Sequence, residues 1–168
     1  MNWLDKYKST LGIRYSSFEK LFQIADERNL KFIVETGTAR GKNKFYYSKP
    51  RINWKDGMST ILFAEYSNLV NGTFWSCDID NQNIFNAYRF TEKFPKKVNF
   101  AVADSIDFLR DLNVNIDILY LDSLDGNIPG ASDHQLKEAE LAIKNLNNNG
   151  LIIFCLLYTS PSPRDKGA

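Results

Sequence analysis

Five short apolar runs recur along the chain, and longer amphipathic segments separate them. This alternation limits the possible folds more than any other feature of the sequence. Strands that are buried on both faces of a parallel sheet have nearly continuous apolar runs of this kind. The sequence therefore predicts an α/β fold with a mostly parallel central sheet and helices on both faces. The predicted strands are residues 32–34, 73–77, 98–102, 116–121 and 151–154.

The segments between these runs predict helices, because their apolar side chains recur at helical spacing. Asp56 and Ser59 are both available to cap the second of these helices. Residues 147–150, Asn-Asn-Asn-Gly, suit a left-handed end for the last one. The predicted helices are residues 16–29, 59–70, 81–94, 105–112 and 132–146.

Composition narrows the class of protein. The 168 residues fit one domain, and 21 basic against 20 acidic residues leave a net charge of +1, which gives no global reason to expect nucleic acid as a partner. Cys77 and Cys155 lie in separate apolar runs, so the sequence does not indicate a zinc site or a disulfide framework. No apolar stretch approaches the ~18 residues that cross a membrane. We therefore expect a cytoplasmic protein with no membrane partner.

Three segments stand apart from the rest of the predicted α/β domain, residues 30–154. Residues 1–29 form a predicted N-terminal helical segment whose aromatic residues fit core packing, a cover over a site, or contact with a second copy in a homo-oligomer. Residues 42–56 form a polar and aromatic insertion, and loops of this length in compact domains are usually functional or mobile. Residues 155–168 form a proline-broken tail that resembles translated adapter sequence; the alternative is a disordered natural terminus.

An acidic residue ends or follows each of the first four predicted strands: Glu35, Asp78, Asp104 and Asp122. Because the carboxyl ends of parallel strands meet at one edge of a sheet, we expect these side chains to form one ligand site there. A carboxylate after the second strand can hold both hydroxyls of a ribose, and one after the third can accept from an adenine amino group. Any one of the four could instead cap a helix, and Asp104 before Ser105 fits both roles.

The first strand runs into the motif E-T-G-T-A-R-G, residues 35–41. Its small residues would let the backbone pass close to a ligand, and Glu35 is placed to accept hydrogen bonds from a cationic amine. A tight turn without a ligand explains the glycines equally well, so this motif alone does not decide between the two readings.

The order of these motifs resembles that of the class I S-adenosylmethionine-dependent methyltransferases. The likeness covers residues 30–154 and rests on E-T-G-T-A-R-G, then D-I-D at 78–80, A-D-S at 103–105 and L-D-S-L-D at 121–125. Within the family it leans towards the small-molecule O-methyltransferase-like members. It implies a three-layer Rossmann-like methyltransferase fold and S-adenosylmethionine as the cofactor.

The resemblance also implies roles for the residues at the strand ends. The methionine part of the cofactor would be surrounded by Glu35, Gly37, Thr38 and Gly41. Asp122 would lie beside the transferred methyl group, and we take it as a catalytic residue that orients the acceptor or holds a metal.

For the adenosine part, the resemblance implies that Asp78 holds the ribose and that Ile79 packs on the adenine. Asp104 and Ser105 would contact the amino edge of the adenine. His134, the only histidine, would begin the last helix and is a candidate general base for a hydroxyl acceptor. A surface or capping role is the more common one for a histidine in that position.

Two features depart from the family pattern. Family members run from the glycine loop directly into a helix, whereas residues 42–56 intervene here; we expect a lid over the cofactor or a small acceptor, although their basic and aromatic residues also suit nucleic acid. The family fold continues with two more strands after the fifth, so we expect the C-terminal strands to be missing. Metal-dependent members place a second acidic ligand where this chain has Cys155-Leu156-Leu157, so no metal site is assigned.

These observations predict an S-adenosylmethionine-dependent methyltransferase that acts on an oxygen of a small metabolite or sugar, with no nucleic-acid partner. Two alternatives stay open. One is a nucleotide-binding oxidoreductase, although the glycine loop lacks the G-x-G-x-x-G sequence that opens directly into a helix. The other is a non-catalytic, truncated remnant that binds little.

Overall fold

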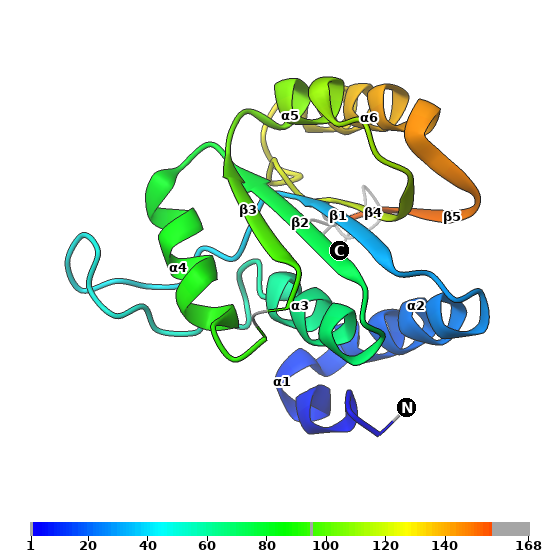
Figure 1. Ribbon diagram of the computed structural model, residues 1–168. Helices are drawn as coiled ribbons and strands as arrows, with labels where there is room; N and C mark the ends of the chain where they lie inside the picture. The colour runs from blue at the N-terminus through cyan, green and yellow to red at the C-terminus, as the bar shows by residue number, and fades with distance from the viewer. Residues whose placement is uncertain (1, 95, 156–168) are drawn as a thin grey trace, which may run out of the picture.

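A five-stranded parallel sheet forms the centre of the molecule in a computed structural model that describes residues 2–94 and 96–155 (Figure 1). The strand order is β3-β2-β1-β4-β5, and every neighbouring pair is parallel. This sheet confirms the predicted fold class. The strands are β1 (Phe32–Thr36), β2 (Thr73–Asp78), β3 (Val98–Val102), β4 (Ile116–Leu121) and β5 (Leu146–Phe154).

Helices cover both faces of the sheet and enclose two hydrophobic cores (Figure 1). Helices α5 and α6 pack on one face, and the other α-helices pack on the opposite face. The result is a three-layer arrangement. The helices are α1 (Lys8–Leu11), α2 (Tyr15–Glu27), α3 (Ser59–Leu69), α4 (Asn81–Thr91), α5 (Ser105–Asp111) and α6 (Ala131–Ala142), with short 3-10 turns η1 (Asp5–Tyr7), η2 (Gly12–Arg14) and η3 (Ile143–Asn145).

The N-terminal segment packs into the core. Leu4 and Leu11 are buried in the larger core, and the Tyr7 hydroxyl donates a hydrogen bond of 2.5 Å to Oε2 of Glu65 on α3. Lys6 also pairs with Glu65. Of the three expectations for this segment, the structure shows core packing.

The end of the sheet differs from the prediction. Helix α6 ends at Ala142, and residues 147–150 belong to β5 rather than to a helix end. The Asn147 side chain donates to Oδ1 of Asp117 at 2.5 Å, where the pairing of β4 with β5 shifts its register. A Cβ atom on Gly150 would lie 3.0 Å from the Asp117 carbonyl oxygen, so this glycine permits a close strand contact instead of a left-handed turn.

Two other predicted segments compare as follows with the structure. Helix α4 ends at Thr91, three residues before its predicted end. Of the predicted tail, residues 155–168, only Cys155 belongs to the described residues. Within residues 2–94 and 96–155, no helix combines the length and the apolar character that a membrane crossing requires.

The strand order creates a crevice at the carboxyl edge between β1 and β4, because the chain leaves β1 on one side and returns on the other. Gly37, directly after β1, has a φ of +79°, and a Cβ atom there would overlap the carbonyl oxygen of Asp122. The Asp122 amide donates to the carbonyl oxygen of Thr36 at 2.9 Å. Only glycine therefore lets the backbones after β1 and β4 meet this closely.

Candidate active site

Three adjoining cavities form one groove along the carboxyl edge of the sheet. We call them the β3-side cavity (about 150 Å³), the central cavity (about 240 Å³) and the β4-side cavity (about 170 Å³). The first two share Asp78, Ile79 and Ser123 in their walls. The last two share Asp122 and other residues of the β1 and β4 loops: Arg40, Gly57 and Asp125.

Asp78 lies at the junction of the first two cavities. Its Oδ2 accepts a hydrogen bond from the Thr38 amide at 3.2 Å, and its Oδ1 accepts from the Asp80 amide at 2.8 Å and from the Asn83 side chain at 3.2 Å. A carboxylate offers about four acceptor positions, so it keeps capacity for a ligand hydroxyl. Ile79 beside it is 75% exposed and lines the same two cavities.

Asp104 and Ser105 line the β3-side cavity together with His134. Oδ1 of Asp104 accepts from the amides of Ile106 at 2.9 Å and Asp107 at 3.4 Å, so this residue caps α5 as the sequence predicts. The Ser105 hydroxyl lies 3.0 Å from Nε2 of His134. These contacts join the first turns of α5 and α6 at the edge of the cavity.

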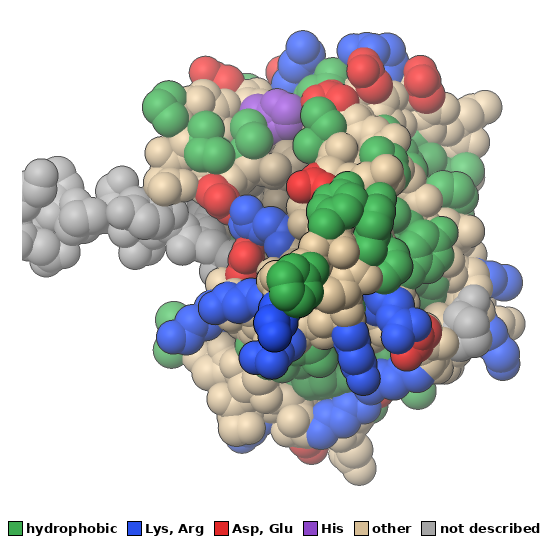
Figure 2. Space-filling view, turned by 90° about the vertical axis from the view of Figure 1, so that its left-hand side faces the viewer, with side chains coloured by type: hydrophobic (Ala, Val, Ile, Leu, Met, Phe, Trp, Pro, Cys, Tyr) green, Lys and Arg blue, Asp and Glu red, His purple; other side chains and the backbone are tan. Residues whose placement is uncertain are grey.

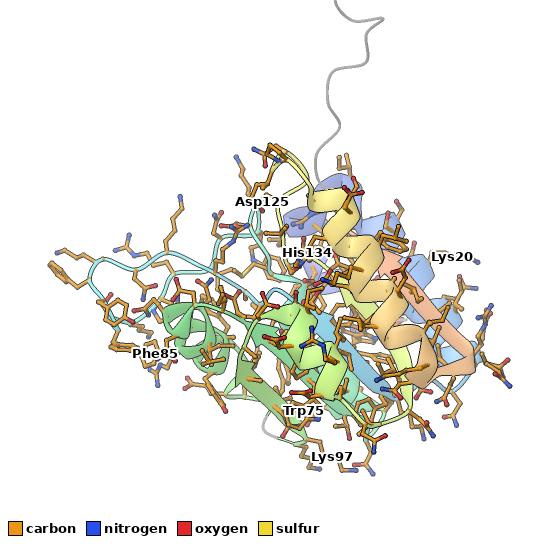
Figure 3. The ribbon with its side chains drawn as sticks, turned by 90° about the horizontal axis from the view of Figure 1, so that it is seen from above. Lys20, Trp75, Phe85, Lys97, Asp125 and His134 are labelled. Carbon is orange, nitrogen blue, oxygen red and sulfur yellow. The ribbon has the colours of Figure 1, made fainter. Side chains whose placement is uncertain are left out.

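The structure does not bring the two predicted catalytic residues together. His134 lines the β3-side cavity, whereas Asp122 lines the other two. Figure 3 shows His134 and Asp125 on the helix and the loop that follow β4. Nε2 of His134 also lies 3.5 Å from the buried carboxylate of Glu138 on the same helix. His134 is therefore placed beside the predicted adenine end of the groove.

The carboxyl of Asp122 has a pKa that suits acid–base chemistry. Burial raises the pKa of its carboxyl to about 7. A hydrogen bond from Cys155 and the charge of Arg40 lower the pKa, while the charges of Asp125 and Asp56 raise it. A group with a pKa near neutrality exchanges protons most readily at physiological pH.

Arg40 is a site residue to which the sequence reading assigned no role. Its guanidinium group pairs with Asp56 at 2.8 Å and with Asp125 at 2.8 Å, and all three line the β4-side cavity. The signal in the sequence was weak, because the two partners follow different strands and only the folded sheet brings them together. Within the described residues, no group of three or more His, Cys, Asp or Glu side chains is arranged to hold a metal ion.

Glu35 is not among the residues that line the three cavities, and its contact with the methionine part of the cofactor stays a prediction. It is fully buried beneath the glycine loop, and burial raises its pKa to about 8. Its carboxyl accepts hydrogen bonds from the hydroxyls of Ser59 at 2.6 Å, Thr60 at 2.7 Å and Ser76 at 2.7 Å. Thr60 in turn accepts from the Ala39 amide at 2.9 Å, so Glu35 supports the loop from behind.

These bonds also explain why the predicted cap of α3 is wrong. The hydroxyl of Ser59 is committed to Glu35, and Asp56 pairs with Arg40, so Met58 precedes the helix without a side-chain cap.

Gly41 also lies away from the groove. A Cβ atom at this position would lie 2.5 Å from the ring of Phe90 on α4, and φ is +66°. The absence of a side chain at Gly41 therefore lets the loop pack closely against α4. Gly37 and Thr38, by contrast, line the central cavity as predicted positions of contact.

The insertion of residues 42–56 does not cover the groove. Its last residues, Lys55 and Asp56, line the β4-side cavity; Asn43 and Tyr47 bond to α4, and Trp54 packs against Tyr7. In Figure 3 the loop extends past Phe85 of α4 and away from His134. The predicted lid is therefore a neighbour of the groove in this structure.

The fold is similar to solved structures of methyltransferases. A Podospora anserina methyltransferase with bound S-adenosylhomocysteine matches with a TM-score of 0.62 and 15% identity, over 92% of this chain and 58% of that chain. A Thiobacillus denitrificans S-adenosylmethionine-dependent methyltransferase in complex with S-adenosylhomocysteine gives 0.52 and 13%, over 81% and 47%. The StiE O-MT structure gives 0.53 and 16%, over 80% and 40%.

The chain spans about half the length of these solved proteins. No protein-family model matches it, and no curated protein does. The strand order and the structural matches nevertheless agree: the chain has the fold of the class I S-adenosylmethionine-dependent methyltransferases.

Proposed function

We propose that the chain binds S-adenosylmethionine in the groove and transfers its methyl group to an oxygen nucleophile of a small metabolite or sugar. The observation that carries this proposal is the position of Asp78, which opens into two cavities at the crevice and keeps free acceptor capacity. The structural likeness to methyltransferases supports it.

The residues of the groove fit the cofactor. Asp78 would accept from the ribose hydroxyls, and the exposed side chain of Ile79 would pack against the adenine. Asp104 and Ser105 would contact the amino edge of the adenine in the β3-side cavity. For the methionine part, Thr38 and its neighbour Gly37 line the central cavity.

The bound cofactor supplies an activated methyl group, so the protein mainly needs to align an acceptor and accept its proton. Asp122 lines the two cavities beyond the predicted adenosine site, and its raised pKa suits it to take a proton from a hydroxyl. Arg40 would hold the loops that carry Asp56 and Asp125 in place around it.

The two described cysteines favour a reducing, cytoplasmic location, which we also propose. Cys77 and Cys155 are both free and buried, so neither forms a disulfide in this chain.

Calorimetric titration tests the proposal. S-adenosylhomocysteine should bind and NAD should not, whereas the oxidoreductase alternative predicts the reverse and a remnant binds neither. Asp78→Ala should weaken S-adenosylhomocysteine at least about tenfold, because a hydrogen bond to a charged group contributes about 1.5–3 kcal/mol. Asp107→Ala, an exposed aspartate that pairs with Arg110 outside the groove, is the matched control. Equal affinity in the folded Asp78 and Asp107 variants would refute the assignment.

A further inference from the structure

The insertion carries a concentration of positive charge that the overall composition hides. Residues 42–55, which we call the basic–aromatic loop, contain five basic side chains and no acidic one, in a chain of net charge +1. None of the five belongs to an ion pair within the part of the chain that the structure describes. The five are Lys42, Lys44, Lys49, Arg51 and Lys55.

The same loop exposes aromatic rings. Phe45 is 68% exposed, Tyr46 66% and Tyr47 46%. The rings of Tyr46 and Tyr47 have centroids 4.2 Å apart, and Tyr47 meets Phe85 of α4 edge-on at 5.0 Å. Figure 2 shows Lys and Arg side chains gathered around hydrophobic ones on this side of the molecule. Clustered exposed rings of this kind mark binding surfaces in soluble proteins.

The loop is a built structure. Lys42 and Arg51 form an antiparallel bridge, with backbone hydrogen bonds of 2.9 and 2.7 Å. The Ser48 hydroxyl accepts from two loop amides, at 3.1 and 3.0 Å. The side chain of Asn86, on α4, donates to Asn43 at 2.6 Å. The backbone that carries the rings is therefore held in one path before any ligand arrives, which lowers the entropic cost of binding.

The loop also adjoins the groove. The Tyr47 amide donates to the side chain of Gln82 at 2.7 Å, on the first turn of α4. Asp80 and Asn83 from this same end of α4 line the central cavity. At the other end of the loop, Lys55 lines the β4-side cavity with Asp122. A molecule whose one end lies at Asp122 can therefore extend onto the loop.

We propose that the basic–aromatic loop binds the methyl acceptor, and that this acceptor is a small molecule of nucleotide type, with a flat base, a phosphate and a sugar hydroxyl. The proposal rests on the proposed function. The unpaired cations attract the phosphate, and the exposed rings offer stacking faces for the base. Lys44 joins both features, since its Nζ lies 5.4 Å from the centroid of the Phe45 ring. A sugar hydroxyl of such a molecule would be the oxygen nucleophile.

Binding measurements test this without knowledge of the natural acceptor. Uridine diphosphate is titrated calorimetrically into the full chain saturated with S-adenosylhomocysteine. We expect binding, at least tenfold weaker binding in the Lys44→Ala/Lys49→Ala variant, and at least fivefold weaker binding in Phe45→Ala/Tyr46→Ala. Lys20→Ala/Lys137→Ala removes two exposed charges from α2 and α6 as a matched control and should bind like the wild type.

The outcomes separate the two proposals. Loop variants should leave the affinity for S-adenosylhomocysteine unchanged, because that titration reports the groove alone. If S-adenosylhomocysteine binds and uridine diphosphate does not, or if the loop and control variants bind it equally, the loop proposal fails and the proposed function stands. If uridine binds as tightly as uridine diphosphate, the phosphate adds nothing to the affinity and the loop proposal also fails. A ten-nucleotide single-stranded RNA that binds more than a hundredfold tighter than uridine diphosphate would assign the surface to a polymer instead.

Discussion

At the scale of single residues, Asp122 shows how charge placement sets acidity. Burial raises the pKa of its carboxyl to about 7, and the charge of Arg40 opposes that rise. We predict that Arg40→Gln raises the pKa of Asp122 further, because an opposite charge is removed and Asp56 and Asp125 lose their partner. Carboxyl-carbon NMR titration measures this directly. Arg89→Gln, which breaks an exposed pair with Glu92, is the control. An unshifted Asp122 titration would contradict the placement of Arg40.

The buried carboxyl of Glu35 makes the stability of the fold depend on pH. Its pKa rises from 4.5 to about 8, so between these values the folded chain holds a proton that the unfolded chain has released. The free energy of unfolding should therefore fall as the pH rises through this window, by about 1.4 kcal/mol per pH unit at most. Glu35→Gln keeps a neutral group in place and should reduce this slope. The raised pKa of Asp122 acts with the same sign, so some slope should remain.

Urea denaturation at pH 5, 6.5 and 8 measures both slopes. If Glu35→Gln loses stability between pH 5 and pH 8 as steeply as the wild type does, Glu35 is not protonated in the folded chain.

At the scale of elements, the N-terminal segment is tied to α3 through one buried carboxylate. We predict that Tyr7→Phe lowers the free energy of unfolding by about 1.5–3 kcal/mol, because Glu65 loses a hydrogen-bond donor while it stays buried. Tyr88→Phe, which removes an exposed hydroxyl from α4, is the control and should change stability by less than about 0.5 kcal/mol. Urea denaturation compares the two, and the affinity for S-adenosylhomocysteine should be the same in both. A smaller loss in Tyr7→Phe than in Tyr88→Phe would contradict this attachment.

The elements also show where sequence reading succeeds and where it stops. Strands that are buried on both faces have nearly continuous apolar sequences, and for this reason all five strands of the sheet were predicted. The first half of β5 was missed, because Asn147 and its neighbours are polar and their pairing depends on Asp117 of β4. The acidic strand ends were placed at the right edge for the same topological reason. The sequence around Glu35 does not reveal that the folded chain buries this side chain completely, so its hydrogen bonds to Ser59, Thr60 and Ser76 behind the loop could not be predicted.

At the scale of the whole molecule, the edge of the sheet at β5 is the feature from which we predict self-association. Within the described residues β5 pairs only with β4, and residues 146–154 carry no charge. Unpaired, uncharged edge strands are templates for pairing between chains. We predict that the 168-residue chain self-associates with rising concentration in sedimentation velocity, and that Phe154→Lys, a change at an exposed end of this strand, reduces the effect. A wild-type chain that stays monomeric over a hundredfold concentration range would contradict the prediction.

The bridge between Lys42 and Arg51 has a consequence for how such a protein can diversify. Because Lys42 and Arg51 are hydrogen-bonded to each other, residues 43–50 form a loop whose two ends lie side by side. Loop closure costs little more for a longer excursion than for a shorter one. The stretch between these two positions can therefore be exchanged for another of different length and chemistry while Gly37, Asp78 and Asp122 keep their places. If the loop binds the acceptor as we propose, exchanging this stretch would change the acceptor while the groove stays as it is.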